Sequence, residues 1–301
     1  MRERGFFPSH PEDAAIHFLG LLSAPELLDQ LVNGVTLGML YILVALGLNI
    51  ILGLMGVINF SHGAFFMLGA YLMYQLNGAI GFWPAILGAA IIVGLLGMAF
   101  ESGLIRPLYK RIPEYTLLLT FGTALIFTQI VRRVWGDDAV RVEQPAYIPQ
   151  SISIGSYQLP FYKDVLLVLL TIVILALVWL LLNKTNIGII IRAGTRDAEM
   201  VKILGINMPL MFTLVFGIGS FMAGLAGALA APIYAVQPQL ASQWIVLTFV
   251  IVIVGGLLIG VLSSLMSLFF PPAVELTGYV IMGIILLVRP RGLFGVEGLF
   301  E

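Results

Sequence analysis

The stretch from Leu31 to Leu54 reads LVNGVTLGMLYILVALGLNIILGL. It carries no charge, and no Asp, Glu, Lys or Arg occurs anywhere between Asp29 and Glu101. A helix needs about 20 apolar residues to cross the hydrocarbon layer of a bilayer. The uncharged run therefore has room for about three crossings, and it predicts a chain that is embedded in lipid.

The composition of the chain points the same way. Of its 301 residues, 60% are hydrophobic and 10% are charged, whereas an ordinary soluble domain has roughly 25% charged residues. A net charge of −1 argues against a nucleic-acid partner, which would need a clustered basic face. The absence of Cys excludes disulfides and thiol catalysis.

Hydropathy predicts an all-α, polytopic transmembrane helical bundle of about eight spans. The first six are expected at Leu31 to Leu54, Val57 to Leu76, Phe82 to Phe100, Tyr115 to Val131, Val165 to Leu182 and Pro209 to Ala231. The apolar stretch from Trp244 to Val288 is interrupted at Gly255-Gly256 and Pro271-Pro272. These interruptions predict broken or re-entrant helices near the C-terminus, next to protein or a water-filled cavity.

The predicted organisation is a leader over residues 1–30, a membrane domain over 31–295 and a short tail over 296–301. Within the leader, Ala14 to Leu28 is either an amphipathic segment on the bilayer surface or loosely ordered. One face of the sixth span carries small residues at every fourth position, namely Gly219, Ala223, Gly227 and Ala231. Such a face predicts close helix packing.

Cationic loops orient the spans, because short loops rich in Lys and Arg stay in the cytoplasm. One such loop holds Arg106, Lys110 and Arg111, and a second covers residues 184–208. The loop over 136–162 is then external, and its alternating stretch from Ile152 to Leu159 predicts a small folded element. Arg289 and Arg291 predict a cytoplasmic C-terminus.

The second expected span opens with a polar group in an otherwise apolar helix: Asn59, Phe60, Ser61, His62 and Gly63. Polar groups in lipid mark packing contacts or pathways, so these residues and Asn49 are candidates for lining a translocation path. For His62 alone, a hydrogen-bonded structural histidine is the favoured interpretation.

Sequence patterns of catalysis are missing. There is no HExxH pair, no glycine-rich phosphate loop followed by Lys, and no His or acid constellation spaced for a metal. We therefore expect no enzyme activity, no metal and no cofactor in this chain.

The loop over 184–208 contains an amphipathic segment between two spans. Thr195 is expected to cap a short helix that places Ala198, Val201 and Leu204 or Lys202 between charges and ends at Gly205. A soluble partner that pushes on a membrane domain would need such a handle. The residues expected to contact it are Arg192, Ala193, Thr195, Arg196, Asp197, Glu199, Met200, Leu204 and Gly205.

At these residues the chain resembles the permeases of branched-chain amino acid ABC importers, specifically the H-type subunit. The resemblance runs from about Leu31 to Gly295. It rests on Asn33 to Gly38, Ala45 to Asn49, Gly56 to Gly63, Arg192 to Asn207 and Arg289 to Gly295. One stretch departs from the family pattern, since Gly255-Gly256 runs straight into Leu257 where members usually carry a longer glycine-rich piece.

The resemblance implies a multi-pass protein of the bacterial cytoplasmic (inner) membrane that pairs with an M-type permease, two ATP-binding cassette ATPases and a solute-binding protein. It also implies that Arg192 to Asn207 couples to an ATPase, with ATP and Mg bound by that partner. Two alternatives stay open: a cargo of urea or short-chain amides, and, in a different class, a self-sufficient carrier or channel.

Overall fold

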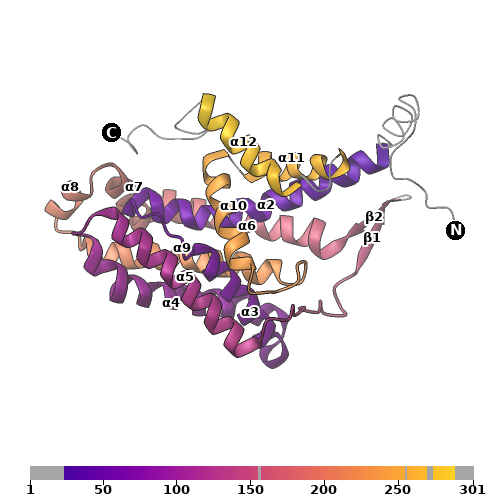
Figure 1. Cartoon of the computed structure of the whole chain (residues 1–301), viewed down its shortest axis with the longest axis horizontal. Coiled ribbons are helices and arrows are strands. Elements are labelled where there is room, and N and C mark those ends of the chain that lie inside the picture. Colours follow the sequence, from indigo (N-terminus) through magenta and orange to yellow (C-terminus); the bar gives the residue numbers. More distant parts are fainter. Residues whose placement is uncertain (1–23, 155–156, 255, 270–273, 289–301) are drawn as a thin grey trace.

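The structure is a computed structural model of the chain, and it describes residues 24–154, 157–254, 256–269 and 274–288. It is a bundle of helices with one small β-hairpin (Figure 1). The first half contains α2 (Ala24–Met55), α3 (His62–Ile80), α4 (Phe82–Phe100), the π-helical turn η1 (Glu101–Ile105), the 3-10 turn η2 (Arg106–Leu108) and α5 (Pro113–Trp135). The second half contains β1 (Ser151–Ile154), β2 (Tyr157–Pro160), the π-helical turn η3 (Phe161–Leu166), α6 (Leu167–Lys184), α7 (Asn186–Arg196), α8 (Ala198–Ile203), α9 (Met208–Ala230), α10 (Leu240–Val254), α11 (Gly256–Phe269) and α12 (Val274–Val288).

Five helical stretches among the described residues are long and apolar enough to cross a membrane, and a sixth is possible if α10 and α11 form one bent span. The five are Leu27–Met55, Phe82–Leu108, Pro113–Trp135, Phe161–Lys184 and Met208–Ala230. They confirm the prediction of a polytopic helical membrane protein. The expected total of about eight spans stays a prediction.

Helix α9 lies in the middle of the bundle, against α2, α3 and α4. Its small residues let the neighbouring backbones come close: a Cβ at Gly227 would overlap the carbonyl oxygen of Phe66 in α3, and one at Gly219 would lie 2.7 Å from the carbonyl oxygen of Gly47 in α2. Ala223 is fully buried beside them. The predicted small-residue packing face is confirmed.

A test of this packing compares two glycines that lie inside helices. Gly69→Ala in α3 would push a methyl group into the backbone of Gly224, whereas Gly122→Ala in α5 has nothing within 4 Å. We expect Gly69→Ala to destabilise the protein by about 1–3 kcal/mol, because neither backbone can retreat, and Gly122→Ala to leave it unchanged or slightly more stable. Thermal unfolding in detergent measures both; equal melting temperatures would contradict the packing.

The two ends of the molecule carry different features (Figure 1). At one end, β1 and β2 form an antiparallel hairpin that pairs Ile152 with Leu159, which confirms the folded element predicted within 136–162. At the other end lie α7 and α8. Arg106 donates a hydrogen bond to the carbonyl of Pro209, so the cationic loop after α4 lies at the same end as the start of α9.

Helices α10 and α11 meet at an angle of 118°. This bend confirms the predicted interruption at Gly255-Gly256. From there α11 runs antiparallel to α2: Leu257 lies against Gly38, and Val261 against Gly34. It thus returns toward the start of α2.

Some predictions fall outside the described residues. They concern the leader up to residue 23, the Pro271-Pro272 interruption, the C-terminal arginines Arg289 and Arg291, and the tail over 296–301.

Candidate functional site

The polar residues of the second expected span lie at a break between two helices. The span was expected to begin at Val57, but α3 begins at His62, so this boundary was wrong. Gly56 has a φ of 62°, and the side-chain oxygen of Asn59 accepts hydrogen bonds from the amide and the hydroxyl of Ser61, at 3.0 and 2.5 Å. These local bonds compete with helix hydrogen bonds and keep the segment non-helical.

His62 is fully buried, and its Nε2 lies 3.0 Å from the carbonyl oxygen of Val44 in α2. A carbonyl only accepts, so Nε2 carries the proton and Nδ1 is left with a lone pair. Neither Nδ1 nor the amide nitrogen of Asn59 has a hydrogen-bond partner among the described residues. The interpretation of His62 as a hydrogen-bonded histidine is therefore confirmed for one ring nitrogen only.

The other candidate residues of the path, Phe60, Gly63 and Asn49, differ in their surroundings. The backbone amide of Phe60 donates a hydrogen bond to the hydroxyl of Thr120. The ring of Phe60 contacts the ring of Phe249 at an interplanar angle of 49°, with the centroids 5.2 Å apart. Gly63 is buried against the backbone of α10. Asn49, in α2, is exposed.

A cavity of about 150 Å³ adjoins the break between α2 and α3. It is lined by the end of α2, the loop after α4 and the start of α5. Its lining includes Gly56, Ile58, Tyr109, Arg111 and Thr116. The cavity wall therefore contains both polar and apolar groups, and Ile58 in this wall directly precedes Asn59 in the chain.

The segment between α6 and α9 forms two helices rather than the single one expected. Thr195 was expected to cap a helix, which was wrong: it lies inside α7, whose cap is Thr185. Asp197 caps α8 instead, because its side chain accepts a hydrogen bond of 2.9 Å from the amide of Met200. Gly205, at a φ of 86°, follows the end of α8 as predicted.

We call residues 185–207 the coupling segment, after the role that the resemblance implies for them, and its candidate residues lie on the surface. All nine residues expected to contact a partner are exposed. Val201 is buried as expected, but Leu204 is 76% exposed and lies on the outer face with Met200 and Ile203. The buried face is thus narrower than predicted, and α8 offers a large apolar surface beside its charges.

The bundle holds α7 firmly. Gly188 lies against the carbonyl oxygens at the end of α6, and Gly194 lies against the side chain of Leu54 at the end of α2. Arg192 donates hydrogen bonds to the carbonyl of Leu182 and, at 3.1 Å, to the side-chain oxygen of Asn183. These contacts fix α7 to α2 and α6.

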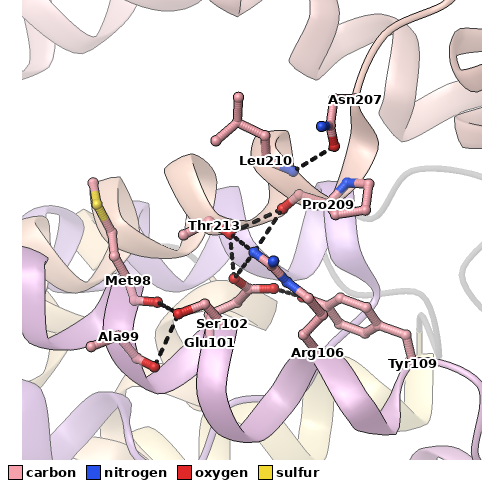
Figure 2. Close-up of polar contacts among 10 residues, drawn as sticks. All are labelled: Met98, Ala99, Glu101, Ser102, Arg106, Tyr109, Asn207, Pro209, Leu210 and Thr213. Carbon is pink, nitrogen blue, oxygen red and sulfur yellow. Dashed lines mark hydrogen bonds and ion pairs between the residues drawn. The ribbon is translucent and has the colours of Figure 1, made fainter.

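An ionic cluster around the buried side chain of Glu101 lies between the end of α4 and the start of α9 (Figure 2). The carboxylate of Glu101 has no exposed surface and accepts hydrogen bonds from Arg106 at 3.3 Å, from the hydroxyl of Tyr109 at 2.5 Å and from the hydroxyl of Thr213 at 2.5 Å. Arg106 also donates to Thr213 and, at 3.4 Å, to the carbonyl of Pro209. The cluster joins the end of α4 to the start of α9.

Sequence reasoning did not single out this cluster. The available signal was an acid that directly follows an uncharged helix and precedes Arg106 by five residues. In the structure these residues occupy a π-helical turn, Glu101–Ile105, a conformation that is frequent at functional sites. Burial raises the pKa of Tyr109 well above its usual value, and the hydrogen bond to Glu101 raises it further, so the phenol stays protonated and donates.

Comparison with known proteins covers nearly the whole membrane domain. Residues 30–289 match the family described as branched-chain amino acid transport system / permease component. The chain is 27% identical over 296 residues to the high-affinity branched-chain amino acid transport system permease protein LivH of Salmonella typhimurium, covering 89% of this chain and 95% of the relative. It is 26% identical over 295 residues to BraD of Pseudomonas aeruginosa, at the same coverage.

A shorter similarity reaches the second permease type. Over 99 residues, which are 32% of this chain and 21% of the relative, the chain is 35% identical to the permease protein LivM of Escherichia coli. No solved structure is significantly similar to this chain. The match over residues 30–289, on a bundle of membrane-spanning helices, means that this chain belongs to the branched-chain amino acid permease family of transport proteins.

Proposed function

We propose that this chain is the H-type permease subunit of an ATP-driven importer of branched-chain amino acids. It would form half of the translocation path beside an M-type permease, while two separate ATPases hydrolyse ATP with Mg and a solute-binding protein delivers the cargo. The chain would lie in the bacterial cytoplasmic membrane with α7, α8 and the C-terminus inside. The hairpin β1–β2 would then face outward.

One observation carries the proposal beyond the family match. Helix α7 of the coupling segment packs on the bundle, whereas α8 exposes Met200, Ile203 and Leu204. Large apolar side chains at the aqueous end of a membrane protein are costly unless a partner covers them. An ATPase that closes on ATP would grip such a surface and transmit its movement.

We place the translocation path along the break between α2 and α3, at Asn59, Phe60, Ser61, His62 and Gly63. The unpartnered Nδ1 of His62 and the unpartnered amide nitrogen of Asn59 support this placement, because buried polar atoms without partners are rare and call for an explanation. Asn49, which is exposed on α2, stays a further candidate for the path.

The test is ATP-dependent uptake in vesicles that contain the chain with its M-type partner and ATPases, in the presence of the solute-binding protein. We expect uptake of radiolabelled leucine only when all components and ATP are present. Uptake of urea or acetamide in place of leucine would assign the alternative cargo. Leucine uptake by this chain alone would contradict the proposal and favour a self-sufficient carrier.

A further inference from the structure

The buried cluster around Glu101 connects two regions that the proposed function treats separately. On one side it holds the start of α9, through Thr213 and the carbonyl of Pro209, only a few residues after the coupling segment ends. On the other side the same carboxylate holds Tyr109, which lines the cavity beside the α2–α3 break. Both connections meet at one side chain with no exposed surface.

The start of α9 is itself tied to the coupling segment. Asn207 caps α9 by accepting a hydrogen bond of 3.2 Å from the amide of Leu210 (Figure 2). One turn further, Phe212 contacts the ring of Tyr109 edge to face, with the centroids 5.2 Å apart. Only the four residues Leu204 to Asn207 separate the end of α8 from the start of α9, so a displacement of α8 would reach α9 through a short connection.

Helices α4 and α9 are packed closely, which opposes sliding of one helix past the other. Gly94 and Gly97 of α4 lie directly on α9, against Gly217, Phe221 and Ser220, and Gly217 lies on Met98 in return. Close packing of this kind transmits strain, because it leaves no space to fill. After Phe100 the α-helix gives way to the π-helical turn η1, which begins with Glu101, and then to the 3-10 turn η2.

From these contacts we propose that Glu101 is a positioning residue that couples the coupling segment to the α2–α3 break, with Tyr109 as the second half of the link. The proposal rests on the proposed function and adds a route within this subunit. When α8 is displaced, α9 carries Thr213 with it, the carboxylate follows Thr213, and Tyr109 moves in the wall of the cavity. These contacts form a continuous path of packed side chains and hydrogen bonds through which coupling can pass.

The experiment uses the complete reconstituted complex and compares Glu101→Gln and Tyr109→Phe with the unaltered protein. Glu101→Gln keeps the shape of the side chain but removes the charge that Arg106 and Thr213 share. Tyr109→Phe removes only the hydroxyl. We expect both complexes to assemble and hydrolyse ATP, while leucine uptake per ATP falls by roughly tenfold for Glu101→Gln and by a smaller factor for Tyr109→Phe.

The control is Asp137→Asn, which breaks an exposed ion pair at the C-terminal end of α5. In this pair Nε of Arg132 lies 3.2 Å from a carboxylate oxygen of Asp137. Asp137→Asn should leave uptake per ATP unchanged. A normal ratio in both test variants would overturn the coupling role, as would a failure of both to assemble, because a purely structural cluster predicts that loss. If the unaltered complex takes up no leucine, the proposed function itself fails, and that result is distinct from either outcome.

Discussion

Replacing Asp197 and Glu199 together by Lys should abolish the ATP hydrolysis that cargo-loaded binding protein stimulates in the reconstituted complex. Both side chains are exposed, and Asp197 caps α8. Two Lys residues would remove the cap and place positive charge at a helix N-terminus, which the helix dipole disfavours. They would also reverse the charge beside the apolar surface of Met200, Ile203 and Leu204. We expect stimulated hydrolysis to fall by about tenfold or more.

Two controls separate the docking surface from the fold. Asp197→Ser keeps a side chain that caps helices well, so it should retain most of the stimulated activity. Asp138→Lys with Glu143→Lys reverses the same number of exposed acids in the loop over 136–162 and should leave hydrolysis unchanged. Unaltered coupling in the Asp197 and Glu199 double variant, with normal ATPase content in the purified complex, would contradict the assigned role of the coupling segment.

The helices of the bundle could be predicted because lipid imposes a simple rule. Backbone groups in hydrocarbon must bond within their own segment, so a long uncharged run has few alternatives to a helix. The run from Leu31 to Phe100 therefore gave helices close to those observed. Small residues on the sixth expected span likewise predicted close packing, since only small side chains permit it.

A break between the first two spans was expected at Met55 and Gly56, but its extension to Ser61 could not be predicted. Val57 and Ile58 continue the apolar pattern, so hydropathy alone carries the helix through them. The non-helical segment depends on a hydrogen bond from Ser61 to the side chain of Asn59 and on the positive φ of Gly56. Both are local choices that compete with helix formation by small margins.

The prediction of the residue that caps α8 was wrong for a related reason. Thr195 and Asp197 are both good caps, and only the extent of α7 decides between them. Because the amide of Asp197 still bonds to the carbonyl of Ala193, α7 reaches Arg196 and encloses Thr195. The Glu101 cluster was harder to predict from the sequence, because Thr213 lies 112 residues from Glu101 in the chain. No spacing rule relates two such positions.

His62 offers the most direct test of the path, because it is buried and only one of its two ring nitrogens is hydrogen-bonded. Nε2 bonds to the carbonyl of Val44, and Nδ1 has no partner among the described residues. If the α2–α3 break lines the path, the free lone pair of Nδ1 is the acceptor that a passing polar cargo or a water would meet. If it does not, the same atom is only an unsatisfied group, which costs stability and nothing else. The two interpretations differ in what removal of the ring should do.

His62→Leu should reduce leucine uptake by the assembled complex by roughly tenfold or more if the ring lines the path. His62→Gln, which offers an amide N–H to the carbonyl of Val44 and an amide oxygen as acceptor, should restore much of it. The matched control is Tyr71→Phe on the same helix, since the Tyr71 hydroxyl is also buried without a partner. Removing that hydroxyl should leave uptake unchanged and stability equal or slightly higher. Normal uptake in His62→Leu would place the path elsewhere and leave His62 as a structural histidine that is held by its hydrogen bond to Val44.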